Sequence, residues 1–194
     1  HLEFEDVNYW GELNDIFEWS KTHVFSTLNI CWAAQASLYY HYGVKKEQVR
    51  DKVFGVFEHD VLIGNHTLTR GFTDTFLAPH SRHTKIEEEK LPTIAELDIL
   101  AKSEDVGTLL VATKDLRKIF ITGHIEYDAD TLHNEYIRDK NSNLPIDIPV
   151  NYYPGNDDEK VPKNRWRGVA YLFYHNWLNQ VYQLTPYDLT ELSK

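Results

Sequence analysis

The sequence predicts an α/β sandwich of three layers, in which helices cover both faces of a mainly parallel β-sheet. Short apolar, β-branched runs alternate along the chain with segments of helical period. One such run leads directly into a helical pattern at 24–43, with a single cysteine between them. The polar turns SEDVG and KDLR separate three short strands, and they indicate an antiparallel hairpin near one edge of the sheet.

Four segments have the pattern of amphipathic helices. Asp6 suits the N-cap of the first, whose apolar side chains recur at three- and four-residue spacing as far as Ser20. Gly43 suits a left-handed C-cap for the second, and Asp130 suits the N-cap of the third. The last has the clearest apolar stripe and ends before Pro186. We expect these helices at 7–20, 32–42, 131–139 and 166–184.

Strands are expected at 24–30, 54–63, 97–101, 108–113 and 118–122. Residues 44–52 predict a short helical or irregular connection, and 69–85 predict a loop long enough to be functional. Residues 141–163 predict an ordered surface loop, because their apolar residues are too many for a free linker. The sequence contains no repeat or low-complexity tract, so we interpret 1–194 as one partial domain with its nucleophile elbow at 24–43.

Composition excludes several classes of protein. Of the 194 residues, 42% are hydrophobic and 26% charged, which is typical of a globular chain. A net charge of −10 argues against nucleic-acid binding, which needs a basic face. No apolar run approaches the roughly 20 residues that cross a bilayer, so no membrane association is expected. One cysteine permits no internal disulfide, which favours a cytoplasmic location.

The chain starts at His1, contains no methionine and opens on a helix without a preceding strand. We therefore expect it to be a part of a longer protein.

Cys31 lies between the expected strand and helix of 24–43. A helix N-terminus carries partial positive charge, which favours the thiolate, the nucleophilic form of cysteine. A lone cysteine is more often a small buried hydrophobe, but strand-to-helix turns are where nucleophile elbows lie. Cys31 is therefore a candidate nucleophile that requires a base.

His124 is the best candidate for that base. The strand at 118–122 ends in Thr122-Gly123, and His124 follows, with Glu126 two residues later. Ligands of open α/β sheets gather at the carboxyl ends of strands, so His124 should share an edge with Cys31. Glu126 is close enough to fix the imidazole tautomer or to face the substrate. A surface histidine beside a solvated glutamate is the alternative for this motif alone.

Other motifs point to no bound cofactor. His80 and His83 in PHSRH could suggest a metal, but no second cluster supplies ligands at a recognisable spacing. No Gly-rich phosphate-binding loop occurs. We therefore expect no metal and no permanently bound cofactor.

Six further motifs run the length of the chain: ICWAAQA, FGVFEH, RGFTDTFLAPHSRHT, TGHIEYD, NYYPGND and NWLNQVYQLTPYDL. Together they resemble one family, the homoserine O-acyltransferases of methionine biosynthesis, an acyltransferase family with a class I glutamine-amidotransferase-like (flavodoxin-like) fold. The resemblance implies an N-terminal portion, with the first strands of the sheet, that this chain lacks. It also implies acyl-CoA and L-homoserine as substrates.

The resemblance assigns roles to matching residues. Cys31 would form the acyl-thioester, His124 would accept the proton and Glu126 would be the third active-site member. The implied substrate contacts are Lys52, Ser81 and Arg138. Taken alone, Arg138 fits a surface ion pair equally well, Lys52 strongly fits a solvated lysine in a charged run, and a turn-forming role is the alternative for Ser81. The chain departs from the family where Ile125 replaces the usual proline of GHPEYD and where WRG at 166–168 replaces WRSH.

The leading hypothesis is ping-pong transfer of an acetyl group from acetyl-CoA to the hydroxyl of L-homoserine. The opening LEFEDVNYW is similar to Gram-positive family members, which favours acetyl over succinyl. Succinyl-CoA as donor and L-serine as acceptor remain alternatives. A glutamine-amidotransferase-like hydrolase is a weaker one, because the G-x-C-x-G pattern is absent around Cys31. A non-enzymatic protein with a packed cysteine is the third. Aromatic content of 13% and the apolar loop at 146–153 favour a homodimer.

Overall fold

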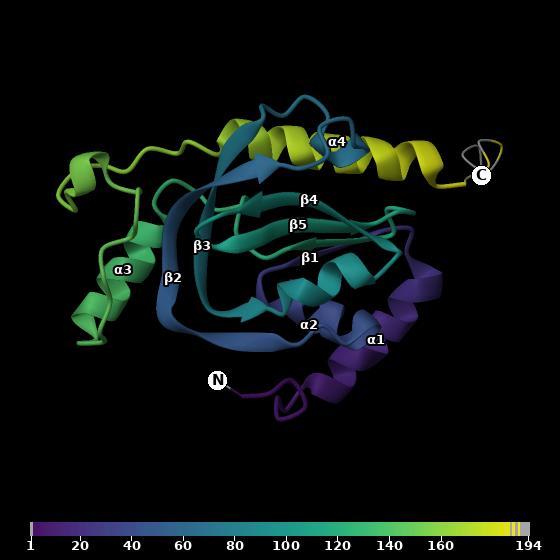
Figure 1. The fold of residues 1–194 in the computed structure, drawn as a ribbon, viewed down its shortest axis with the longest axis horizontal. Coiled ribbons are helices and arrows are strands. Elements are labelled where there is room, and N and C mark those ends of the chain that lie inside the picture. The colour runs from purple at the N-terminus through teal and green to yellow at the C-terminus, as the bar shows by residue number, and fades with distance from the viewer. Residues whose placement is uncertain (1, 187, 189, 191–194) are drawn as a thin grey trace.

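The computed structural model describes residues 2–186, 188 and 190, and within them a six-stranded mixed sheet with helices on two sides (Figure 1). The strands are β1 (Thr27–Ile30), β2 (Lys46–Val61), β3 (Thr75–Ile86), β4 (Leu97–Ser103), β5 (Gly107–Thr113) and β6 (Lys118–Ile121). Their order in the sheet is β1-β6-β5-β4-β2-β3. The helices are α1 (Trp10–His23), α2 (Trp32–Tyr42), α3 (Thr131–Asn141) and α4 (Arg167–Leu184), with short 3₁₀ turns at Thr67–Thr69, Glu88–Thr93 and Pro154–Asn156.

The prediction of a mainly parallel sheet is wrong. Only β1 and β6 pair in parallel, and every other neighbouring pair among the described strands is antiparallel. The connections at 104–106 and 114–117 are tight turns, and a parallel crossover needs a dozen residues or more. Antiparallel pairing, which the sequence predicts only for a hairpin near one edge, therefore extends through most of the sheet.

Helices cover both faces of the sheet, as the sequence predicts. Along β6, Ile119 and Ile121 pack towards α4, while Phe120 between them packs towards α2. This alternation is the period of two that a strand imposes on its side chains. In Figure 1, α4 runs above the sheet and α2 with α1 lies below it. The helical contacts on the two sides come from Ala170 and Phe173, and from Ala34 and Leu38.

Two segments predicted as irregular are long strands. Residues 46–52 open β2, and 75–85 belong to β3, which pairs with β2 over most of its length. In β3 the side chains of His80, Arg82 and Thr84 point inward and are buried, whereas 81, 83 and 85 are more exposed. Buried and exposed side chains alternate as in an ordinary strand, but the buried ones are polar, so a hydropathy pattern does not reveal the strand.

The helices largely agree with the sequence. α2 has the expected bounds, and Gly43 closes it with φ 65°. α1 starts at Trp10, later than expected, because Asp6 lies in a preceding turn and Tyr9 is the N-cap. Asp130 precedes α3 without a side-chain capping hydrogen bond. Among the described residues, no helix is long and apolar enough to cross a membrane.

The loop at 141–163 is ordered, as expected, and packs beside β2. Its residue Val150 forms a parallel bridge to Gly55. Gly55 has φ 148°, and a Cβ there would lie 2.4 Å from the carbonyl oxygen of Val150. Only glycine permits this approach, so the FGVFEH motif fixes the position of the loop.

Candidate active site

Cys31 occupies a sharp turn between β1 and α2. Its backbone has φ 52° and ψ −116°, a conformation that is rare for residues other than glycine. Its N–H donates to the carbonyl of Ile121 at 2.7 Å, and its carbonyl accepts from the N–H of Gln35 at 3.2 Å. These bonds hold the strained turn, and such outliers cluster at functional sites. The expected sharp turn between strand and helix is therefore present at Cys31.

His124 follows β6, the strand that pairs in parallel with β1. Cys31 and His124 consequently lie at the carboxyl ends of two adjacent parallel strands, as the sequence predicts. The N–H of His124 donates to the carbonyl of Pro79 at 2.8 Å, which ties it to β3. Its Nδ1 lies 2.6 Å from Oε1 of Glu126, and its ring stacks on Tyr127 with centroids 4.1 Å apart.

The pKa of His124 is raised. Burial by itself would lower it, but hydrogen bonds with Cys31 and Glu126, and the negative charges of both groups, raise the pKa of His124 to about 9. The imidazole is then protonated at neutral pH and can pair with a thiolate. The arrangement can hold a proton beside the sulfur and can return it to a leaving group.

A cavity of about 510 Å³ opens beside Cys31. Trp32, Gln35 and Ser81 line it together with the basic side chains Lys46 and Arg82. A cavity of that size admits a small organic group, and its cations suit an anionic one.

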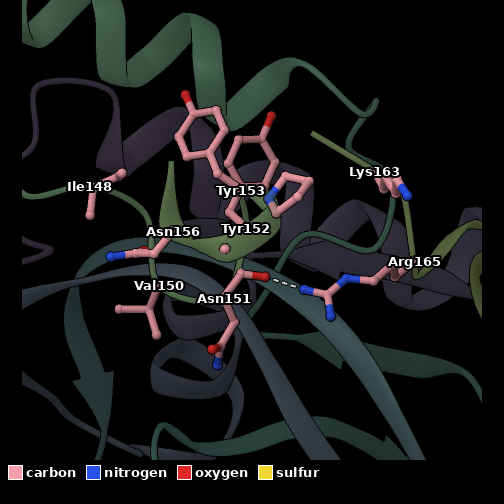
Figure 2. Close-up of a pocket in the computed structure, with 10 residues that line it drawn as sticks. Ile148, Val150, Asn151, Tyr152, Tyr153, Asn156, Lys163 and Arg165 are labelled. Carbon is pink, nitrogen blue, oxygen red and sulfur yellow. Dashed lines mark hydrogen bonds between the residues drawn. The ribbon is translucent and has the colours of Figure 1, made fainter. Parts of the chain in front are cut away.

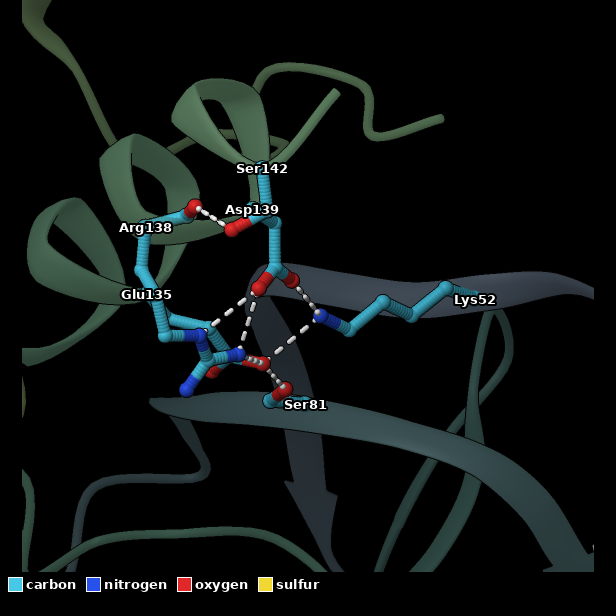
Figure 3. A network of polar contacts seen from close by, with 6 residues as sticks. All are labelled: Lys52, Ser81, Glu135, Arg138, Asp139 and Ser142. Atoms are coloured by element: carbon cyan, nitrogen blue, oxygen red, sulfur yellow. Dashed lines mark hydrogen bonds and ion pairs between the residues drawn. The ribbon is translucent and has the colours of Figure 1, made fainter. Parts of the chain in front are cut away.

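The three predicted substrate contacts form one network, which Figure 3 shows. Glu135 on α3 is at its centre: Nζ of Lys52 lies 2.6 Å and Oγ of Ser81 2.8 Å from its Oε1. Arg138 contacts the carboxylate of Asp139 through Nε at 2.7 Å and Nη2 at 2.6 Å. Lys52 also lies 3.6 Å from Asp139. Side chains from β2, β3 and α3 therefore meet at one point.

Sequence reasoning missed Glu135 and Asp139. Both flank Arg138 in the EYIRD segment, and their spacing of four residues places them on one face of α3. That pattern is a signal, but on a helix rich in charge it describes a solvated face equally well. Only the fold shows that Lys52 and Ser81 approach from two strands.

Tyr127 connects the two groups electrostatically. Burial raises its pKa first, and the negative charges of Glu135, Cys31 and Glu126 raise it further. Arg138 acts on the same hydroxyl in the opposite direction. Tyr127 is therefore close enough to the cysteine turn and to the α3 network for the charges of both to act on its hydroxyl.

The histidines of PHSRH do not come together. His80 points into the protein and its Nε2 lies 3.1 Å from Nε2 of His59, whereas His83 is exposed on the other face of β3. Across residues 2–186, 188 and 190, no group of three or more His, Cys, Asp or Glu side chains is placed to hold a metal ion.

A second cavity, of about 640 Å³, lies on the loop after α3 (Figure 2). Tyr152, Tyr153 and Lys163 line it, as does Arg165, which donates to the carbonyl of Asn151. It shares no lining residue with the cavity of Cys31, so it lies outside the candidate site.

The fold is similar to that of solved glutamine amidotransferases. A solved glutamine amidotransferase from Methylobacillus flagellatus aligns with 97% of this chain and 75% of its own, at a TM-score of 0.69 and 11% identity. One from Thermotoga maritima aligns with 93% and 74%, at a TM-score of 0.67 and 13% identity. At this identity the likeness concerns the fold alone, and it agrees with the fold that the family resemblance implies.

The sequence comparison is more specific. The model of the family described as homoserine O-succinyltransferase matches residues 1–187, and the chain belongs to that family. A homoserine O-acetyltransferase from Petrotoga mobilis is 54% identical over the whole chain, and one from Lachnoclostridium phytofermentans is 55% identical over 97% of it. The chain spans 63% of the length of each of these relatives.

Proposed function

We propose that the protein is a homoserine O-acetyltransferase of methionine biosynthesis, with Cys31, His124 and Glu126 as its catalytic residues. One observation carries the proposal: the strained turn places Cys31 beside a histidine that Glu126 holds at 2.6 Å. The names of the relatives favour acetyl as the acyl group. A cytoplasmic location accords with such an enzyme.

The first half-reaction loads the cysteine. The Cys31 thiolate attacks the thioester carbonyl of acetyl-CoA and forms a new carbon–sulfur bond. The bond between the carbonyl carbon and the sulfur of CoA then breaks, and protonated His124 supplies the proton that CoA takes as a thiol. One thioester replaces another, so this step is nearly neutral in free energy.

The second half-reaction transfers the acetyl group. Neutral His124 removes the proton from the hydroxyl of L-homoserine, whose oxygen attacks the carbonyl carbon of acetyl-Cys31. The ester bond forms, the carbon–sulfur bond to Cys31 breaks, and the enzyme regains a thiolate beside a protonated imidazole. Glu126 keeps the imidazole oriented and stabilises its charged form in both half-reactions.

The α3 network supplies groups for the amino acid. Arg138 has a side chain 66% exposed and a planar guanidinium that can grip the substrate carboxylate bidentately. Glu135, which is 18% exposed, can accept the substrate ammonium. Lys52 between Glu135 and Asp139 offsets their repulsion, and Ser81 orients Glu135. The homoserine hydroxyl would then extend towards Cys31.

Steady-state kinetics test this proposal on the protein expressed from its complete gene. Acetyl-CoA and succinyl-CoA are each compared with L-homoserine and L-serine as acceptors. We expect the highest kcat/KM for acetyl-CoA with homoserine, and parallel double-reciprocal lines. The variant His124→Gln should lose activity by several orders of magnitude, whereas His23→Gln, on the exposed end of α1, should retain it. Release of ammonia from glutamine without acyl transfer would contradict the proposal.

A further inference from the structure

A charged side chain, Arg82, is buried in the middle of β3 behind the candidate site. Its relative exposure is 6%, and burying a cation without a partner is costly. Its hydrogen bonds go to neutral acceptors: Nδ1 of His80 at 3.4 Å, the carbonyl of Thr84 at 2.7 Å and the carbonyl of Val106. Among the described residues no ion pair joins it to a carboxylate. Such a charge calls for an explanation.

The proton positions behind Arg82 can be assigned one after another. The carbonyl of Phe57 can only accept, so Nδ1 of His59 is the protonated nitrogen in their 3.0 Å bond. Burial lowers the pKa of His59 to about 4, so the ring is neutral and its Nε2 is an acceptor. His80, whose pKa burial also lowers, then donates from Nε2 at 3.1 Å and keeps a bare Nδ1. That bare nitrogen receives the Nε–H of Arg82.

In this relay, Phe57–His59–His80–Arg82, every hydrogen bond therefore donates in the direction from Arg82 to Phe57, and each of the two imidazoles has only one possible tautomer. His80 is fully buried, and it also packs against the catalytic segment, because a Cβ on Gly123 would lie 2.9 Å from its Cε1. The guanidinium of Arg82 is consequently held by packing and by hydrogen bonds to neutral groups.

The residue at the end of the relay, Arg82, lies on the cavity of Cys31. Burial lowers the pKa of Arg82, and the negative charge of Cys31 acts against this lowering. Glu88 also acts to raise the pKa of Arg82, but its carboxylate is already paired with Lys102 at 2.7 Å. Of the other basic groups on this cavity, Lys46 donates to the carbonyl of Leu2 and lies over the ring of Phe4.

We propose that Arg82 is a positioning residue for Cys31: its buried charge, held by the His59–His80 relay, stabilises the negative charge on the sulfur. The inference rests on the proposed function for its role in catalysis, since a stabilised thiolate matters only if Cys31 is the nucleophile. The alternative is that Arg82 merely fastens β3 to the turn at Val106.

Alkylation by iodoacetamide separates these two roles. The protein contains one cysteine, so every label reports on Cys31, and the measurement needs no acyl-CoA. In Arg82→Gln we expect alkylation at pH 7 to slow about tenfold, because the positive charge that stabilises the thiolate is lost. At about pH 10, where thiols in general are ionised, the rates of the two proteins should agree. Arg82→Lys should restore most of the rate at pH 7.

The matched control is Arg50→Gln, which removes the same charge from an arginine whose side chain is 95% exposed, and it should alkylate like the parent. Equal rates for Arg82→Gln and the parent at pH 7, or a loss of the same size at every pH, would overturn the proposal. If Arg82→Gln does not fold, His59→Gln decides: a several-fold slowing confined to neutral pH supports the relay, and an unchanged rate overturns it. A failure of acyl transfer with this alkylation pattern intact would refute the proposed function only.

Discussion

Replacing Glu126 by glutamine tests the electrostatics of the site through one measurable quantity, the pKa of His124. The carboxylate lies 2.6 Å from Nδ1, and the amide of glutamine has the same shape without the charge. A rise from the ordinary 6.5 to about 9 means that the folded protein favours the imidazolium by about 3 kcal/mol. This figure is a net free energy, because burial disfavours the imidazolium while Cys31 and Glu126 favour it. Cys31 and Glu126 both raise the pKa of His124, so the loss of either negative charge should lower this pKa by at least about one unit.

A titration by NMR of the histidine Cε1–H resonances gives this pKa directly. The signal of His124 is assigned by its absence from His124→Gln. We expect a midpoint near 9 in the parent protein and a clearly lower one in both Glu126→Gln and Cys31→Ser. A parent midpoint at or below 6.5, or one that neither substitution moves, would refute the reasoning.

The same shift predicts the pH dependence of stability. The pKa of His124 is higher in the folded than in the unfolded chain, so protonation stabilises the fold fully below about 6.5. This stabilisation declines as pH rises from 6.5 and is gone above about 9. Urea unfolding at both ends of that range should show a smaller decline in Glu126→Gln than in the parent protein.

Three further substitutions test the packing around the site. Gly123→Ala should cost about 1–3 kcal/mol in urea unfolding, because its Cβ would lie 2.8 Å from the carbonyl of Pro79, whereas Gly168→Ala on α4, where nothing lies within 4 Å, should be neutral or stabilising. Lys52→Met should cost about 1–3 kcal/mol, because it leaves the mostly buried carboxylate of Glu135 with Arg138 at 3.8 Å in place of Lys52 at 2.6 Å, and adding Glu135→Gln should recover part of the loss. Phe120→Ala should cost about 3–5 kcal/mol by opening a cavity between the sheet and α2, and Leu178→Ala, at a side chain 59% exposed, should change stability by less than about 0.5 kcal/mol.

The elements that were predictable from the sequence are those whose signals are local. α2 lies between a cysteine turn and Gly43, and β4, β5 and β6 are apolar runs between polar turns. β3 was missed because a buried strand normally declares itself by apolar side chains, and here His80, Arg82 and Thr84 occupy the inward positions. Two of these polar side chains, His80 and Arg82, belong to the relay that we propose acts on Cys31.

The candidate site likewise contains residues with a local signal in the sequence and residues without one. Cys31 was identified by its place at a turn, and His124 with Glu126 by a short motif at a strand end. Glu135 and Asp139 could not be identified, because their role depends on Lys52 and Ser81 arriving from strands far away in the sequence. Likewise, the antiparallel sheet follows from turn lengths and long-range pairing, which alternating helices and strands do not determine.

The most direct test of the central claim is the mass of the protein after brief exposure to acetyl-CoA without an acceptor. The protein expressed from its complete gene is mixed with acetyl-CoA, quenched in acid and analysed intact and after digestion. The acyl-Cys mechanism predicts a gain of one acetyl group on the peptide that contains Cys31, its absence in Cys31→Ser, and its loss when L-homoserine is added. An unmodified Cys31 in a protein that still acetylates homoserine would contradict the mechanism.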